Sequence, residues 1–111
     1  MTSNGVNPAP QKDETLGKYV AFRIITMLIN EAADALFWQI ATKEAIDLAM
    51  TKGVNYPKGL LAWADEIGLA KCMERMDALY DEYREDRYRC SPLVRRMALE
   101  GKTFFEKEII V

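Results

Sequence analysis

The most constraining feature of this sequence is one long apolar segment, residues 16–41, LGKYVAFRIITMLINEAADALFWQIA. Placed on a helix, the segment is apolar on almost every side apart from a narrow polar line. That line consists of Arg23, Thr26, Asn30 and Asp34, at spacings of three and four residues. A helix of this kind is buried either in a protein core or in a bilayer. We predict one helix of about 37 Å, at 1.5 Å per residue, around which the other elements pack.

The same segment argues against a membrane span and in favour of a second subunit. Its longest weakly polar run, residues 19–29, contains Arg23 and is shorter than the roughly 20 residues that cross a bilayer. A chain of 111 residues has room for only a few more short helices. Because these do not cover so wide an apolar surface, we expect a homodimer in which a second copy covers part of the long helix.

The connection GVNYPKG, which starts at Gly53, follows a predicted second helix that Thr42 caps at its N-terminus. Gly53 is expected to end that helix in the left-handed conformation. Pro57 disfavours a helical conformation at Tyr56, and Gly59 allows a close turn into the next helix. We predict a rigid corner in which the tyrosine ring folds back over the core.

Three more helices are predicted from their periodicity and end signals. LLAWADEIG, residues 60–68, predicts a short helix that ends at its glycine, and residues 69–83 form a longer amphipathic helix. The Ser-Pro pair at residues 91–92 starts a last helix that stops at Gly101. The predicted fold class is all-α, with four or five helices around one long central helix.

The ends of the chain and its cysteines complete the predicted organisation. Residues 1–15 are rich in Gly, Asn, Pro and Ser and lack the apolar run of a signal peptide, so we expect a floppy tail. Residues 16–111 form the single helical domain, in which 102–111 fit either an extended or a helical conformation. Cys72 and Cys90 are too far apart for a CxxC pair, and we expect reduced, buried thiols in a cytoplasmic protein.

Composition excludes several function classes. The formal charge of −2 and the pI near 5.2 disfavour nucleic-acid binding. The chain contains no histidine, the usual general base near neutral pH and the commonest metal ligand. Its six glycines stand singly, so neither GxGxxG nor a P-loop can be written. We therefore expect no metal site and no cofactor-binding residue in this chain, and a lone-domain enzyme would have to work with Asp, Glu, Lys, Tyr or Cys.

The polar line on the long helix leaves two interpretations open. Charges on a buried helix must be paired or hydrogen-bonded, so these side chains are candidates for a ligand site. The candidates are Arg23, Asn30, Glu31 and Asp34. Alternatively they bind one another and nearby helix ends, which is the commoner arrangement.

Four segments, in this order and spacing, resemble the C-terminal helical domain of 3-hydroxyacyl-CoA dehydrogenases. They are FRIITMLINEA, ATKEAIDLAMTKGVNYPKG, LLAWADEIGL and SPLVRRMALEGK, and the resemblance covers residues 17 to about 105. Each segment is weak alone, but the ordered combination is specific. The positions that match the family's motifs are Arg23, Asn30, Glu31, Asp47, Tyr56, Pro57, Gly59, Asp65 and Gly68.

The resemblance implies a domain without chemistry of its own. In that family a separate Rossmann domain carries the GxGxxG loop, the NAD and a His and Glu pair, while the helical domain supplies one asparagine just before the arginine that matches Arg23. Phe22 stands at that position here. Leu60 replaces a family proline, and the closing glycine-rich pattern survives only as Gly101 and Lys102. These departures resemble the second helical copy of duplicated enzymes, whose implied role is to pack on the first copy as a dimer partner would.

From this resemblance we expect a stand-alone, non-catalytic helical domain. It dimerises or serves as an accessory subunit in fatty-acyl or aromatic-acid β-oxidation. Two alternatives stay open. One is an acyl-CoA-binding helical protein without catalysis, in which basic residues meet the CoA phosphates. The other is half of a split NAD-dependent 3-hydroxyacyl-CoA dehydrogenase, completed by a separate Rossmann chain. As a pairing partner we expect a second copy of the chain or the helical domain of a full-length dehydrogenase.

Overall fold

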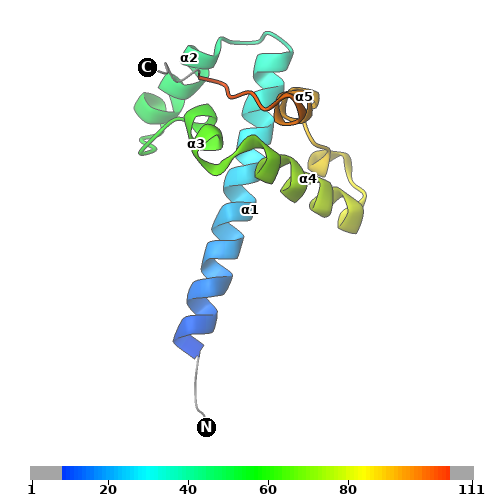
Figure 1. Ribbon diagram of the computed structural model, residues 1–111. Coiled ribbons are helices and arrows are strands. Elements are labelled where there is room, and N and C mark those ends of the chain that lie inside the picture. Colours follow the sequence, from blue (N-terminus) through cyan, green and yellow to red (C-terminus); the bar gives the residue numbers. More distant parts are fainter. Residues whose placement is uncertain (1–8, 106–111) are drawn as a thin grey trace, which may run out of the picture.

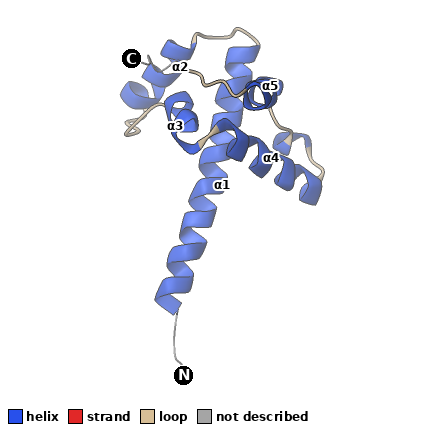
Figure 2. Ribbon diagram, viewed as in Figure 1, coloured by secondary structure: helices blue, strands red, loops and turns tan. Residues whose placement is uncertain are grey.

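The computed structural model describes residues 9–105 of the 111-residue chain. Its α-helices are α1 (Ala9–Phe37), α2 (Lys43–Leu48), α3 (Leu60–Ile67), α4 (Leu69–Tyr83) and α5 (Pro92–Glu100). A π-helical turn (Ala49–Gly53) follows α2, and a 3-10 turn (Asp86–Tyr88) follows α4. Residues 9–105 contain helices and loops but no strand, as Figure 2 shows. The predicted all-α class, with four or five helices around a long central one, is confirmed.

The helix α1 is the axis of the molecule, but the other helices cover only its C-terminal half. In Figure 1, α3, α4 and α5 lie around the upper part of α1, and the N-terminal part projects away from them. The radius of gyration is 16.8 Å, against about 13 Å for a compact domain of this length. Thr26, Ile29 and Ala33 are fully buried in the covered half, whereas every residue from 15 to 21 is exposed.

The start of α1 differs from the predicted one. The helix begins at Ala9, so residues 9–15, which belong to the predicted floppy tail, are helical. Residues 1–8 of that tail lie outside the described residues. None of the helices between residues 9 and 105 has the length and apolar character needed to cross a membrane.

The end of α1 is set by Gln39 and comes earlier than the apolar pattern predicts. Gln39 has a positive φ of 59°, the left-handed conformation. Its N–H donates to the Leu36 carbonyl at 3.0 Å, and the Ile40 N–H donates to the Ala35 carbonyl at 2.9 Å. These are the two hydrogen bonds of a Schellman motif, which satisfy the last carbonyls of the helix. The apolar segment therefore turns out of the helix after Phe37, although its hydrophobicity continues.

Most predicted helix ends are confirmed. Thr42 Oγ1 and Ser91 Oγ each accept a backbone N–H of the helix that follows, at 3.1 and 3.3 Å. Gly68, with φ 104°, separates α3 from α4, and Gly101, with φ 70°, ends α5. Local chemistry determines these ends, because a cap hydroxyl or a left-handed glycine acts within one turn.

The predicted left-handed conformation of Gly53 is wrong. The left-handed residue of this connection is Asn55, with φ 64°. After α2 the helix widens into the π-helical turn, and the Tyr56 N–H donates to the Met50 carbonyl at 3.0 Å. The reversal is thereby delayed by two residues, to an asparagine whose short polar side chain tolerates this conformation.

The core lies between the covered half of α1 and the inner faces of α3, α4 and α5. Its buried apolar members are Ile29, Ala32, Ala33, Leu60, Leu61, Ala64, Leu69, Cys72, Met76, Leu79, Tyr88, Cys90, Val94 and Phe104. Tyr56 is half-buried and packs against this core, as predicted. Phe104 brings the segment after α5 back to the core; residues 106–111, where the conformation was left open, lie outside the described residues.

Candidate functional site

Asp47 and Gly59, two of the motif positions, meet at the N-terminus of α3. The Asp47 carboxylate accepts the Leu61 N–H at Oδ1 and the Ala62 N–H at Oδ2, both at 2.9 Å. It satisfies N–H groups that have no partner within the helix, and its charge opposes the helix dipole. A Cβ on residue 59 would overlap the Asp47 carboxyl group. Gly59 therefore leaves space for this cap, which is a more specific role than the close turn expected from the sequence.

Asn30 and Asp65 hold other chain segments in a similar way. Asn30 Nδ2 donates to the Arg89 carbonyl at 2.9 Å, and its Oδ1 accepts the Ser91 N–H at 2.6 Å. The Asp65 carboxylate accepts the N–H groups of residues 104–105 at 2.8 and 2.9 Å. Both side chains therefore bind backbone groups and fasten the segments that flank α5.

Arg23 joins α1 to the turn after α4. Its Nη2 donates to Tyr88 Oη at 2.9 Å. The guanidinium carbon lies 5.3 Å from the centre of the Tyr83 ring and 5.6 Å from that of Tyr88. The hydrogen bond to Tyr88 is the main reason why the pKa of Arg23 is raised above its ordinary value. The Arg23 cation thus interacts with two aromatic rings, and these contacts connect α1 to the end of α4 and the 3-10 turn that follows it.

The remaining motif positions lie apart from one another. Glu31 and Pro57 are exposed, and Gly68 is the turn between α3 and α4. Asp34, which belongs to the polar line and not to the motif positions, is half-buried, and its Oδ1 is buried without a hydrogen-bond partner among the described residues. The structure thus distributes the predicted positions over several junctions between elements, and only Asp47 and Gly59 form a joint arrangement.

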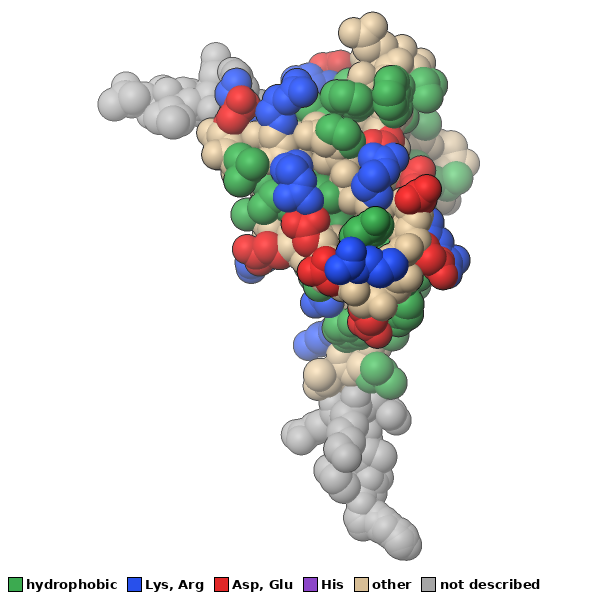
Figure 3. All heavy atoms as spheres, turned by 90° about the vertical axis from the view of Figure 1, so that its right-hand side faces the viewer, with side chains coloured by type: hydrophobic (Ala, Val, Ile, Leu, Met, Phe, Trp, Pro, Cys, Tyr) green, Lys and Arg blue, Asp and Glu red, His purple; other side chains and the backbone are tan. Residues whose placement is uncertain are grey.

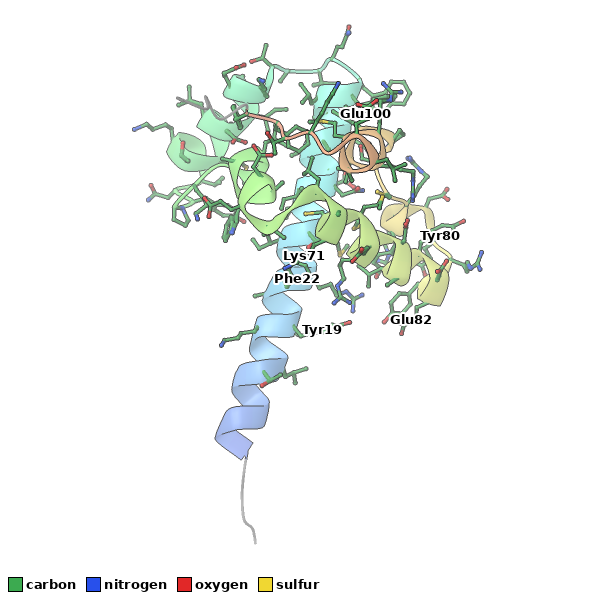
Figure 4. The ribbon with its side chains drawn as sticks, viewed as in Figure 1. Tyr19, Phe22, Lys71, Tyr80, Glu82 and Glu100 are labelled. Atoms are coloured by element: carbon green, nitrogen blue, oxygen red, sulfur yellow. The ribbon has the colours of Figure 1, made fainter. Side chains whose placement is uncertain are left out.

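A cavity of about 370 Å³ lies beside Phe22, between α1 and α4. It is lined by Phe22, Lys71, Glu74, Arg75 and Ala78. Figure 4 shows Phe22 and Lys71 where α4 begins to cross α1, with Tyr19 further along the projecting part of α1. An aromatic ring of α1 and a charged face of α4 therefore share this cavity.

Arg75 is held by aromatic rings in this cavity. Its guanidinium carbon lies 4.9 Å from the centre of the Tyr19 ring and 5.4 Å from that of Phe22. Nη1 donates to Tyr19 Oη at 3.4 Å, and Nε is buried without a hydrogen-bond partner among the described residues. The ion pairs between described side chains involve other cations. Stacking holds the guanidinium in place, and none of the described carboxylates pairs with its charge.

Neither Arg75 nor Lys71 was predicted from the sequence as a site residue. A signal for Arg75 was present, because it lies three residues after Cys72 and four before Leu79, which are both buried. Helical periodicity therefore places a charged residue at the border of the buried face of α4. Its aromatic neighbours come from α1, however, and no pattern within α4 indicates them.

The described side chains offer binding groups more than catalytic ones. Cys72 and Cys90 are free and buried, and burial raises the pKa of each thiol to about 11. Both thiols are therefore protonated and unreactive near neutral pH. Within the described part of the chain, no three Cys, Asp or Glu side chains gather closely enough to hold a metal ion. Neither thiol lines the cavity beside Phe22.

Comparison with protein families and curated proteins finds close sequence relatives. The family described as 3-hydroxyacyl-CoA dehydrogenase, C-terminal domain, matches residues 19–106. The 3-hydroxyadipyl-CoA dehydrogenase of Escherichia coli is 44% identical over 78 residues, which are 70% of this chain and 16% of that protein. A probable 3-hydroxybutyryl-CoA dehydrogenase of Deinococcus radiodurans is 36% identical over 100 residues, 90% of this chain and 36% of that protein.

Solved structures show the same fold. The crystal structure of (S)-3-hydroxybutyryl-CoA dehydrogenase from Ralstonia eutropha matches with a TM-score of 0.69 at 42% identity, covering 71% of this chain and 28% of that chain. The crystal structure of FadB2 from M. tuberculosis matches with a TM-score of 0.74 at 25% identity, covering 77% of this chain and 32% of that chain. The chain spans about one sixth to about one third of the length of these relatives.

Proposed function

This chain belongs to the family of 3-hydroxyacyl-CoA dehydrogenase C-terminal domains, and from this premise we propose that its 111 residues have an assembly role without catalysis. In this role α1 pairs with a second helical domain. The partner is a second copy of the chain or the helical domain of a dehydrogenase that acts in fatty-acyl or aromatic-acid β-oxidation. We place this assembly in the cytoplasm.

The observation that carries this proposal is the environment of Phe22. The resemblance puts the family's asparagine at this position, whereas here a phenyl ring lies 5.4 Å from the guanidinium carbon of Arg75. A phenyl ring offers no hydrogen bond to a substrate oxygen. The 111 residues also contain no histidine that could move a proton near neutral pH. Catalysis by this surface would need groups that it does not carry.

The projecting part of α1 supports the assembly role. Leu16, Val20 and Ile24 lie four residues apart on one side of the helix and are 61%, 43% and 51% exposed. On the face seen in Figure 3, hydrophobic side chains lie where the molecule narrows, beside charged ones. An isolated helical segment of this length is only marginally stable in water. In an antiparallel pair, Leu16 lies opposite Ile24 of a second copy and the two Val20 side chains face each other.

The catalytic half of the proposal is tested by incubating the purified chain with NADH and acetoacetyl-CoA. We expect no loss of NADH absorbance beyond that of the buffer, because the 111 residues contain no histidine and Phe22 offers no hydrogen bond where the family has its asparagine. The matched variant Phe22→Ala should behave identically. Turnover by the wild-type chain that changes in this variant would contradict the proposal.

The assembly half is tested by sedimentation velocity at micromolar concentration. We expect a dimer for the wild type and a monomer for Val20→Glu, because a carboxylate would be buried at the centre of the apolar stripe. Lys18→Glu, an exposed change on the same helix, is the control and should remain dimeric. Circular dichroism checks that both variants stay helical. A monomeric wild type would contradict pairing between two copies.

A second candidate function is acyl-CoA binding without catalysis. It is favoured by Lys71 and Arg75, which place two cations beside the apolar ring of Phe22. Titration calorimetry with butyryl-CoA tests it, and the absence of heat at millimolar ligand would exclude it. A third candidate is half of a split dehydrogenase, for which NADH turnover should appear only after a Rossmann chain is added.

A further inference from the structure

Arg75 presents a fixed cation at the cavity beside Phe22, and no described carboxylate forms an ion pair with it. The ring of Tyr19, at 4.9 Å, and the ring of Phe22, at 5.4 Å, restrict where the guanidinium can lie. Its one hydrogen bond, to Tyr19 Oη, is long at 3.4 Å. A partly buried cation without an anion is unfavourable, and a bound anion would relieve that cost. The geometry therefore favours an anionic ligand.

The lining of the cavity restricts the kind of anion. A guanidinium presents its N–H groups as a planar fork that matches the two oxygens of a carboxylate. Glu74 also lines the cavity and repels a doubly charged phosphate group more strongly than a singly charged carboxylate. Lys71, one helical turn before Arg75, adds a second cation to the lining. Phe22 and Ala78 supply apolar surface for the body of the ligand.

We propose that this cavity binds a small-molecule carboxylate whose body is an aromatic ring or a short alkyl chain. The carboxylate pairs with Arg75, and the body lies against Phe22 and Ala78. The volume of about 370 Å³ lies at the lower end of the range for ligand pockets and suits a ligand of this size. This ligand differs from the acyl-CoA of the second candidate function, although both would use the same cavity, and the inference is independent of dimer formation.

The test is a titration of the wild-type chain with benzoate and with hexanoate, followed by NMR of backbone amides. We expect saturable shifts at Phe22, Arg75 and Ala78 at millimolar ligand. Benzamide and hexanamide, which have nearly the same shape without the charge, should produce much smaller shifts. Arg75→Gln should weaken carboxylate binding about tenfold or more, the loss of one charge-assisted hydrogen-bonded pair. Lys52→Gln, an exposed change away from the cavity, should leave it unchanged.

Three results would overturn the proposal: no saturable shift with either carboxylate, equal shifts with the amides, or binding that Arg75→Gln leaves unchanged. Inorganic phosphate that binds as tightly as benzoate would overturn the assignment to carboxylates. If Arg75→Gln does not fold, Arg75→Lys, which keeps the charge and removes the fork, should still reduce the preference for carboxylate over amide. Butyryl-CoA has no free carboxylate and therefore separates the two proposals. If butyryl-CoA binds and benzoate does not, only the acyl-CoA candidate is supported. If benzoate binds and butyryl-CoA does not, only the carboxylate site is supported.

Discussion

At the scale of single residues, Asp47 and Gly59 act as one unit. The carboxylate reaches two N–H groups of α3 only because residue 59 has no side chain. The Asp47 cap requires the space that a side chain at residue 59 would fill, which explains why residue 59 is a glycine. The sequence interpretation noted both residues as motif positions, but nothing in their spacing indicates that they touch.

A double-mutant cycle measures this coupling by urea denaturation. Asp47→Ala should lower the free energy of unfolding by about 2–3 kcal/mol, because two charge-assisted hydrogen bonds are lost. Gly59→Ala should cost about 2 kcal/mol in the wild type through steric overlap. In the Asp47→Ala background the same glycine change should cost at least about 1 kcal/mol less. Additive effects would show that the two residues act separately; exposed Asp81→Ala is the control for loss of a carboxylate.

The two buried thiols make stability depend on alkaline pH. Burial raises the pKa of the Cys72 thiol and that of the Cys90 thiol from the ordinary 9.0 to about 11. Because the folded state favours the neutral thiol, the stabilisation is complete below pH 9 and is lost as the pH rises toward 11. We expect a loss of about 2 kcal/mol per thiol by pH 11. In Cys72→Ala, the fall in the free energy of unfolding across this range should be smaller by that amount. Equal falls in both proteins would contradict the prediction.

At the scale of elements, Asn30 connects α1 to the start of α5. Its amide spans the Arg89 carbonyl and the Ser91 N–H, and both Asn30 and Ser91 are buried. Asn30→Ala should lower the free energy of unfolding by about 3 kcal/mol, since a buried N–H loses its partner. Hydrogen exchange should accelerate most at Ser91. The control is Glu31→Ala, the exposed neighbour on the same helix, which should change stability by less than about 0.5 kcal/mol.

The covered and projecting parts of α1 have different sources of stability. The covered half is held by the core, in which Ile29 and Ala33 are fully buried. The projecting half has exposed residues throughout 15–21, and helical propensity alone stabilises so short a segment poorly. Because the projecting half lacks the support of the core, we expect a second chain to cover that half of α1.

At the scale of the whole molecule, the proposed pairing of two copies through α1 would couple folding to protein concentration. A ligand or partner that binds only the folded chain raises its apparent stability by mass action. The melting temperature of the wild type should therefore rise as protein concentration is increased from micromolar to hundreds of micromolar. Val20→Glu should show no such rise. A wild-type melting temperature that is independent of concentration would contradict self-pairing.

The sequence by itself determined the all-α class and most helix ends, because these depend on chemistry within one or two turns. The cap at Ser91 and the glycines Gly68 and Gly101, which both have a positive φ, act through their own backbone and immediate neighbours. The predicted left-handed end at Gly53 was wrong, because a π-helical turn shifts the left-handed residue to Asn55.

Only the tertiary structure decided what the polar side chains bind and which surface is left uncovered. Asp47 caps a helix that starts 13 residues later, at Leu60, and Arg75 stacks on rings from α1, 56 residues away in the case of Tyr19. Such contacts depend on how helices are placed in space, and a periodic pattern contains no information about that placement. The apolar residues Leu16, Val20 and Ile24 can be recognised in the sequence. They are exposed because α3 and α4 do not extend along this part of α1.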